Sequence, residues 1–173
     1  MTRIEEVLSG KKTDIVKKCF NLTVETYPPE TAGLLKRERD RFLNPVGFTI
    51  RSEIENIFDE VVGAMDAERL LASLENVIKI RAIQNFAPSE AISFVYLLKR
   101  SIREEFTSIA DFELRLSRTN VRGIAEQKLI EELVLLDERI DRVALLAFDV
   151  YVQCREKIHE IKLKEAKALH GRR

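Results

Sequence analysis

The feature that most constrains this chain is a heptad pattern of apolar residues in its last third. Apolar side chains recur there at alternating spacings of four and three, at Leu129, Leu133, Leu136, Ile140, Val143, Ala147, Val150 and Cys154. This spacing keeps one stripe of a long helix facing a partner. A helix over residues 124–168 would be roughly 65 Å long at about 1.5 Å per residue. Because the rest of a 173-residue chain does not easily cover such a helix, we expect part of it to meet another chain or to project as a lever.

The heptad stripe has two interpretations that the sequence alone leaves open. The first, which we adopt as the prediction, is a dimer seam formed by Leu136, Ile140, Val143, Ala147, Val150 and Cys154. The second is that the same stripe packs inside the chain's own core. Changing Val143 and Val150 to aspartate separates the two, because it would break a dimer in the first case and unfold the monomer in the second.

Composition and periodicity predict a single all-α domain over residues 1–173. Apolar residues make up 45% of the chain, enough to build a core, and only six glycines and four prolines interrupt it. Strand signals are nearly absent, whereas helical spacing of apolar residues predicts a helical core over residues 12–106, ahead of the long helix. The start of the chain lacks an apolar leader and no apolar run is long enough to span a bilayer. We therefore expect a cytoplasmic protein without membrane insertion.

Local signals predict several helix boundaries. Asp66 can cap the helix that follows it, and Pro88 suits the first turn of the next one. The Asn-Pro-Val-Gly sequence at residues 44–47 indicates a turn, in which Gly47 can take a positive φ. The helical pattern weakens at Thr119 and Asn120, where we expect a break before the long helix.

Residues suited to catalysis or metal binding are scarce, so we expect no enzyme, no cofactor and no metal site. The chain has two histidines, and it has no HExxH, CxxC or glycine-rich phosphate motif. We interpret His159 as a partly exposed residue near a helix C-terminus, in preference to a haem ligand. Cys19 and Cys154 are isolated and are expected to stay reduced on apolar helix faces. Lys plus Arg equals Asp plus Glu, at 29 each, so no net field favours a nucleic acid.

One acidic residue, Asp149, stands among apolar neighbours on both sides. A carboxylate there is predicted to be at least partly buried, and leaving it unpaired would cost several kcal/mol. Arg51, Lys79 or Arg81 from another helix would neutralise it. The preferred interpretation is a polar lock that sets the register of the long helix. The alternative is that Asp149 lines a ligand cavity or couples a cavity to the lever.

A second group of polar residues, Arg81, Gln84 and Asn85, lies where apolar and polar residues alternate on every helix face. Such a helix usually passes through the middle of a fold, with its polar groups satisfied by internal hydrogen bonds. These three residues are also the candidates for binding a polar ligand. The sequence does not decide between the two roles.

Three stretches of the chain combine residues in an order that resembles a known family. They are residues 27–31 with 42–51, residues 80–91 with Phe94 and 97–99, and residues 139–142 with 147–151 and 154–157. Through them, about residues 10 to 165 resemble the N-terminal sensor domain of the RsbRD-type co-antagonist proteins of bacterial stressosome signalling.

The resemblance implies a haem-free, globin-like helical dimer whose C-terminal helix leads to a phosphorylatable STAS domain. It supplies no catalytic or ligand-binding residues. Since Arg173 ends the sequence before any STAS domain, we expect a stand-alone sensory or regulatory domain. It would form a homodimer, bind a signal or a signalling protein, and transmit through the long helix. The alternative is a protein-interaction or scaffolding module with no small ligand.

Overall fold

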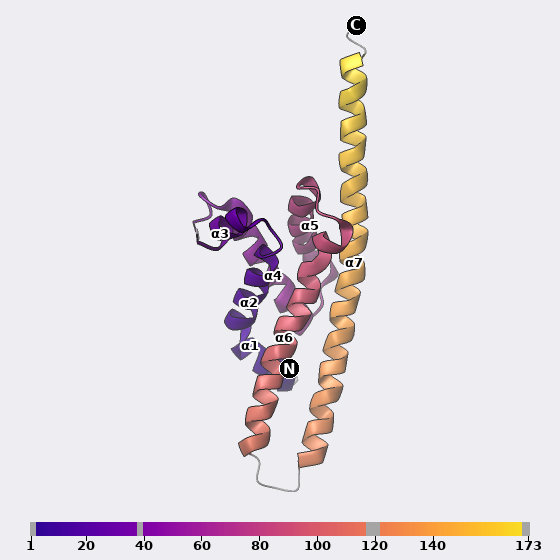
Figure 1. Cartoon of the computed structure of the whole chain (residues 1–173). Helices are drawn as coiled ribbons and strands as arrows, with labels where there is room; N and C mark the ends of the chain where they lie inside the picture. Colours follow the sequence, from indigo (N-terminus) through magenta and orange to yellow (C-terminus); the bar gives the residue numbers. More distant parts are fainter. Residues whose placement is uncertain (1–2, 38–39, 117–121, 171–173) are drawn as a thin grey trace.

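The computed structural model describes residues 3–37, 40–116 and 122–170, which form seven helices and no strand. This confirms the all-α prediction, including the long C-terminal helix. Figure 1 shows the other helices gathered along one side of the long C-terminal helix. The helices are α1 (Arg3–Gly10), α2 (Lys12–Val24), α3 (Pro29–Arg37), α4 (Pro45–Val62), α5 (Ala67–Ile83), α6 (Pro88–Leu116) and α7 (Arg122–His170).

Two predicted helix starts are confirmed. Asp66 is the N-cap of α5, and its Oδ1 accepts a hydrogen bond from the backbone N–H of Arg69 at 3.0 Å. Helix α6 begins at Pro88, whose missing N–H costs nothing in the first turn. The Glu90 carboxylate accepts from the backbone N–H of Ala87 at 3.0 Å and so satisfies a donor just ahead of this helix. The predicted break at Thr119 and Asn120 lies outside the described residues.

The turn prediction for residues 44–47 is wrong in one respect. Gly47 lies in the first turn of α4, and no described glycine has a positive φ. Asn44 is the N-cap: its Oδ1 accepts from the Gly47 N–H at 2.8 Å, while its Nδ2 donates to the Leu35 carbonyl at 3.0 Å. A Cβ on Gly47 would lie 2.8 Å from Asn44 Cγ. Glycine is therefore needed here for close approach of the cap, and its conformational freedom is not used.

We expect Asn44→Ala to lower the free energy of unfolding by about 1–2 kcal/mol, measured by urea denaturation. The change removes the cap of α4 and leaves the Leu35 carbonyl without its partner. Asn56→Ala is the control, because that exposed amide donates to the Glu53 carboxylate on its own helix. A loss for Asn44→Ala no larger than that for Asn56→Ala would contradict the capping role.

The core lies between α7 and the helices that precede it. Helices α5 and α6 both pack against α7, α4 packs on α5, and α2 packs on α6 and α4. The predicted core segment, residues 12–106, supplies most of the buried apolar residues, and α7 closes the cluster.

The predicted dimer seam on α7 is part of this core. Its six positions are at most 7% exposed within the single chain, so the seam prediction is corrected to the internal-core alternative. The physical reason is that α5 and α6 already cover the stripe. A heptad pattern specifies that a stripe must be covered, and it does not specify by which helix. The seam positions are Leu136, Ile140, Val143, Ala147, Val150 and Cys154.

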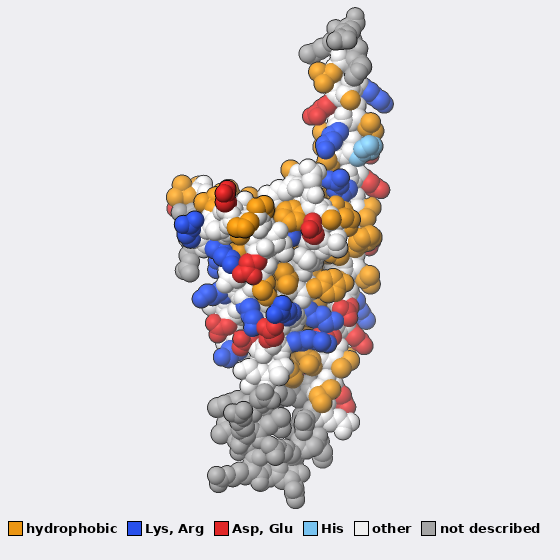
Figure 2. All heavy atoms as spheres, viewed as in Figure 1, with side chains coloured by type: hydrophobic (Ala, Val, Ile, Leu, Met, Phe, Trp, Pro, Cys, Tyr) orange, Lys and Arg blue, Asp and Glu red, His pale blue; other side chains and the backbone are white. Residues whose placement is uncertain are grey.

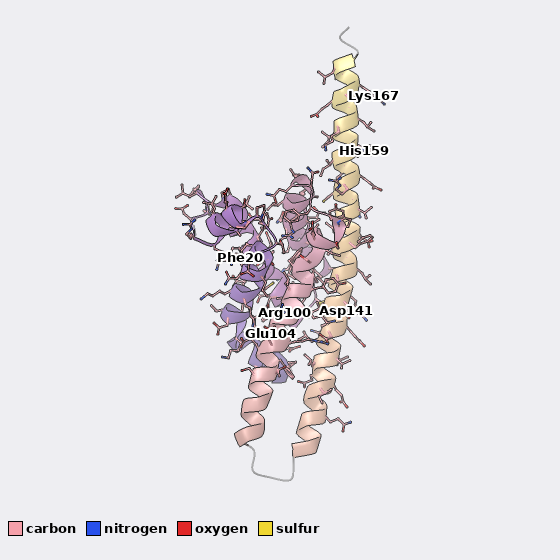
Figure 3. All side chains as sticks on the ribbon, viewed as in Figure 1. Phe20, Arg100, Glu104, Asp141, His159 and Lys167 are labelled. Carbon is pink, nitrogen blue, oxygen red and sulfur yellow. The ribbon has the colours of Figure 1, made fainter. Side chains whose placement is uncertain are left out.

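Helix α7 continues well past the body of the molecule (Figure 1). From Glu156 to Leu169 every side chain except that of Ile158 is exposed. Figure 3 places His159 and Lys167 on this projecting segment, clear of the other helices. His159 is thus exposed, as the sequence predicts. The helix is both a wall of the core and a rod that extends from it.

The two thiols should be unreactive in the folded protein. Cys19 is fully buried, and burial raises the pKa of its thiol to about 12. Burial also raises the pKa of Cys154. Since only the thiolate reacts, we expect neither cysteine to react with Ellman's reagent within minutes at pH 8, and both to react in denaturant. Rapid modification of Cys19 in the native protein would contradict this burial.

Candidate functional site

An arginine buried at the end of α5 joins three parts of the chain. Arg81 is 0% exposed and is among the largest fully buried side chains. Its Nη2 donates to Thr26 Oγ1 at 2.9 Å, just after α2, and to the Glu90 carbonyl at 2.8 Å, in α6. Its Cζ lies 4.2 Å from the ring centroid of Phe86 and 5.3 Å from that of Tyr27. We call Arg81, Thr26, Tyr27, Phe86 and Glu90 the Arg81 centre.

The charge of Arg81 is balanced only in part, because the Glu90 carboxylate acts on it from beyond ion-pair distance. Among the described residues no ion pair involves it, and its Nε and Nη1 atoms are buried without a hydrogen-bond partner, as is the Tyr27 hydroxyl. Burial lowers the pKa of the Arg81 guanidinium, an effect that Tyr27 and Glu90 oppose. Burial raises the pKa of the Tyr27 phenol, and the charge of Arg81 opposes that. An arginine stays protonated even so, hence the centre holds a cation whose direct contacts are two aromatic rings and two neutral oxygens.

Helix α7 binds the loop that carries Phe86. The Tyr151 hydroxyl donates to the Phe86 carbonyl at 2.9 Å. One turn later, Arg155 Nη1 lies 3.3 Å from the Ala82 carbonyl and 3.3 Å from Asn85 Oδ1, and it donates to both. Asn85 has φ 61°, a left-handed conformation that asparagine tolerates better than most residues. The α5–α6 loop therefore lies between the Arg81 centre and the base of the projecting rod.

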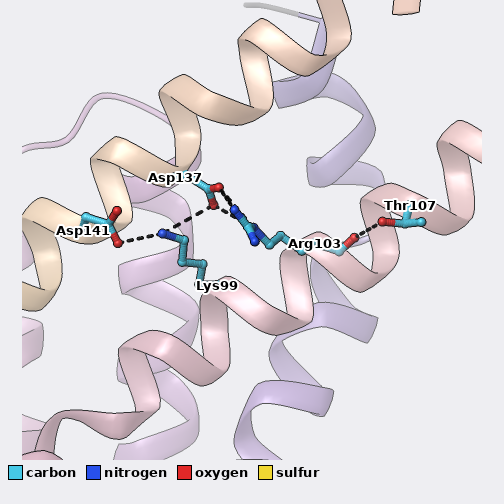
Figure 4. Close-up of polar contacts among 5 residues, drawn as sticks. All are labelled: Lys99, Arg103, Thr107, Asp137 and Asp141. Atoms are coloured by element: carbon cyan, nitrogen blue, oxygen red, sulfur yellow. Dashed lines mark hydrogen bonds and ion pairs between the residues drawn. The ribbon is translucent and has the colours of Figure 1, made fainter.

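A ladder of charged residues holds α6 against α7 farther from the rod (Figure 4). Lys99 Nζ lies 2.7 Å from Asp141 Oδ1 and 3.8 Å from Asp137 Oδ1, and Arg103 pairs with Asp137. Thr107 donates back to the Arg103 carbonyl at 2.9 Å, within α6. Half-exposed pairs of this kind contribute little stability each, about 0–1 kcal/mol. Their clearer effect is to fix the antiparallel register of α6 and α7.

Beyond this ladder α7 presents an uncovered apolar face. Leu145, Phe148 and Val152 follow heptad spacing and are 71%, 47% and 39% exposed; we call them the outer stripe. The antiparallel register puts the exposed Tyr96 of α6 level with Leu145. Figure 2 shows hydrophobic side chains along this part of α7, next to a band of mixed charge. The outer stripe lies on the opposite side of α7 from the buried seam.

The structure separates the residues that the sequence predicted to form a polar lock. Asp149 is exposed, in contrast to the predicted partial burial, and no partner for it exists in the part of the chain that is described. The guanidinium Cζ of Arg51 lies 4.1 Å from the ring centroid of Phe20 in the core, and Lys79 pairs with Glu75 at 3.7 Å. Asp149 has apolar neighbours because it falls between the buried seam and the outer stripe.

Of the three other candidates, only Arg81 and Asn85 take part in the same network. Gln84 is exposed, and Asn85 is exposed but accepts from Arg155. Sequence reasoning missed Tyr27, Phe86 and Tyr151, which complete the network. The available signal was an aromatic residue immediately before or near each proline-containing loop, at Tyr27-Pro28 and Phe86-Ala87-Pro88.

Other surface features do not suggest a catalytic centre. A polar hollow between α4 and α5 is lined by Glu53, Asn76 and Arg69 among others, and Asn76 donates to Glu53 across it at 2.8 Å. Within the described ranges, no group of three or more His, Cys, Asp or Glu side chains is placed to hold a metal ion. No described helix is long and apolar enough to cross a membrane.

Comparison with known proteins gives one match. No curated protein matches the chain significantly, and no solved structure does. Residues 13–165 match the family described as the RsbT co-antagonist protein rsbRD N-terminal domain, which confirms the resemblance seen in the sequence. This match covers most of the chain. The chain therefore belongs to the rsbRD N-terminal domain family, a family of stressosome-associated regulatory signalling domains that is not a known enzyme family.

Proposed function

We propose that this domain is a sensory or regulatory module in which a signal or protein partner acts on the helical body and α7 carries the change outward. The observation that carries the proposal is the pair of contacts from Tyr151 and Arg155 to Phe86 and Asn85 of the α5–α6 loop. These side chains are four residues apart, so they lie on one face of α7 and bind the same loop. A change in this loop must break or move both contacts.

Transmission of this kind needs two arrangements with different affinities for the signal. The α5–α6 loop suits such a change, because Phe86 is only partly buried and Asn85 is held at a positive φ. The rod follows Arg155, since every side chain of α7 from Glu156 to Leu169 except that of Ile158 is exposed. A shift of the loop would therefore act on α7 at the base of the rod. A small rotation of α7 at that point produces the largest displacement at the C-terminal end of the rod.

We propose further that a second copy of the chain covers the outer stripe of Leu145, Phe148 and Val152. These residues have heptad spacing, which suits pairing with another helix. They are apolar and clustered, whereas the surface next to them carries Lys99, Asp137 and Asp141 already paired with one another. The dimer therefore forms through the outer stripe and leaves the buried seam intact.

The test is the subunit mass of Leu145→Asp. We expect wild-type protein to be a dimer and the variant to be a monomer at about 10 μM in analytical ultracentrifugation, with the dimer dissociation constant raised at least about 100-fold. The melting point of each folded chain should change little, because Leu145 is 71% exposed and packs little against its own chain.

Leu34→Asp is the matched control, since Leu34 is 59% exposed on α3, which does not pack against α7. This variant should remain a dimer. A monomeric wild-type protein, or a dimer that Leu145→Asp leaves intact, would remove the outer stripe as the pairing surface.

A scaffolding module with no small ligand is the second candidate. The observation in its favour is the filled core, in which the largest buried side chains are 0–1% exposed and pack against one another. In a scaffold the contacts of α7 would stay the same when a ligand is added, whereas in a sensor they would change when the ligand binds. A shift of the Arg155 NMR signal on ligand addition would favour the sensor over the scaffold.

A further inference from the structure

The Arg81 centre holds a buried positive charge that forms no ion pair among the described residues, and the Glu90 carboxylate acts on it only from a greater distance. Protein interiors pair almost every buried polar group, and an isolated buried charge costs several kcal/mol or more. Arg81 uses only Nη2, so its Nε–H and Nη1–H groups remain without acceptors, beside the unpartnered hydroxyl of Tyr27. An acceptor that carries negative charge would satisfy these donors.

We propose that the Arg81 centre binds a small monovalent anion, of formate or chloride size, through Arg81 and the Tyr27 hydroxyl. The rings of Phe86 and Tyr27 lie 4.2 Å and 5.3 Å from Cζ, so they occupy space near the guanidinium. The anion therefore approaches the N–H groups that the rings and the Thr26 and Glu90 oxygens leave unused. Little space is left for a larger ligand, because Arg81 and Tyr27 are already buried.

The centre is close to the surface even though its side chains are buried. Thr26 and Glu90, the two residues that accept from Arg81, are both exposed. Phe86, on the loop above the guanidinium, is only partly buried. Phe86 and the exposed Thr26 and Glu90 are therefore the residues that separate the guanidinium from solvent.

The anion would also act on α7, a step that rests on the function proposed above. The Phe86 ring packs against the guanidinium, and the Phe86 carbonyl is the acceptor for Tyr151. The neighbouring Asn85 is bound by Arg155. Binding at Arg81 is thereby linked to the two contacts that hold the base of the rod.

The test is an NMR titration of the full chain labelled with ¹⁵N-arginine, using sodium formate and sodium chloride as probes. The Nε–H signals of Arg81 and Arg155 are assigned by their loss in Arg81→Lys and Arg155→Lys. We expect the Arg81 signal to shift and saturate with a dissociation constant of about 10 mM for at least one probe. At about 100 mM, such binding raises the folded-to-unfolded ratio about elevenfold, a rise in Tm of about 3–6 °C.

Arg81→Met separates this binding from general salt effects, because it keeps the volume and removes the charge. Its Tm should respond to the probes several degrees less than that of the wild type. Ile78→Ala, one turn earlier in the buried face of α5, should lose stability yet keep the wild-type response. Tyr27→Phe should weaken binding several-fold. It serves as the second variant if Arg81→Met does not fold.

The outcomes distinguish the two proposals. A saturable shift at Arg81 that also moves Arg155 supports both the anion site and transmission to α7. A shift at Arg81 alone supports the anion site and contradicts transmission. An unmoved Arg81 signal, or equal Tm responses in wild type and Arg81→Met, overturns the anion site and leaves the function of α7 to be judged by its own test.

Discussion

Val143→Asp is expected to unfold this protein at 25 °C. Val143 is 0% exposed and lies in the seam where α7 meets α5 and α6. The substitution buries a carboxylate with no cation in place, at a cost of several kcal/mol, and forfeits about 1.5–3 kcal/mol of apolar burial. Together these approach the whole stability of a typical domain, about 5–15 kcal/mol. Loss of helical far-UV circular dichroism, or a Tm below room temperature, is the measurement.

Leu145→Asp is the matched control, because it places the same residue on the same helix two positions later. Leu145 points to the opposite side of α7 and is 71% exposed. This variant should keep the helical spectrum and a Tm close to that of the wild type. If Val143→Asp instead gives a folded monomer, the seam lies between subunits and the internal-core arrangement is incorrect.

Arg81→Ala should lower the free energy of unfolding by about 2–4 kcal/mol. The truncation leaves a cavity beneath Phe86 and Tyr27, as a large-to-small core substitution does, and removes the hydrogen bonds to Thr26 and Glu90. The gain from removing a poorly balanced buried charge offsets part of this loss. The difference is measured by urea denaturation of the wild type and Arg81→Ala, with the same m-value fitted to both.

Arg81→Met is the informative comparison, because methionine fills much of the same space without a charge. We expect it to stay within about 1 kcal/mol of the wild type, measured without added anion. If Arg81→Met is as unstable as Arg81→Ala, the charge and its hydrogen bonds stabilise the fold. The centre would then be satisfied without a ligand.

Much of the fold was predictable because its signals are local. Asp66 and Pro88 mark helix starts through bonding within one turn, and both predictions are confirmed. The helical spacing of α4 to α7 is likewise a property of neighbouring residues. Gly47 was misread because a glycine after Asn-Pro suggests a turn, whereas the reason for it is the approach of the Asn44 side chain.

The candidate site was predictable only in part. Arg81 and Asn85 stood out because polar residues interrupt an apolar helix, but their partners come from residues 26–27 and from α7. Nothing in the spacing along the chain links Tyr27 or Tyr151 to Arg81. Asp149 was misplaced for a related reason, since apolar neighbours on both sides suggested burial although only one side of α7 faces the core.

The long helix α7 separates what the local sequence pattern determines from what tertiary packing decides. Its heptad pattern specified a continuous helix with one stripe to be covered, because periodicity follows from helix geometry alone. Only the packing of α5 and α6 decided that the stripe is internal and that Leu145, Phe148 and Val152 remain uncovered. Tertiary packing likewise brought the ends of α2 and α5 and the start of α6 around Arg81. Contacts between distant segments depend on how the whole chain fills its core, which no single segment encodes.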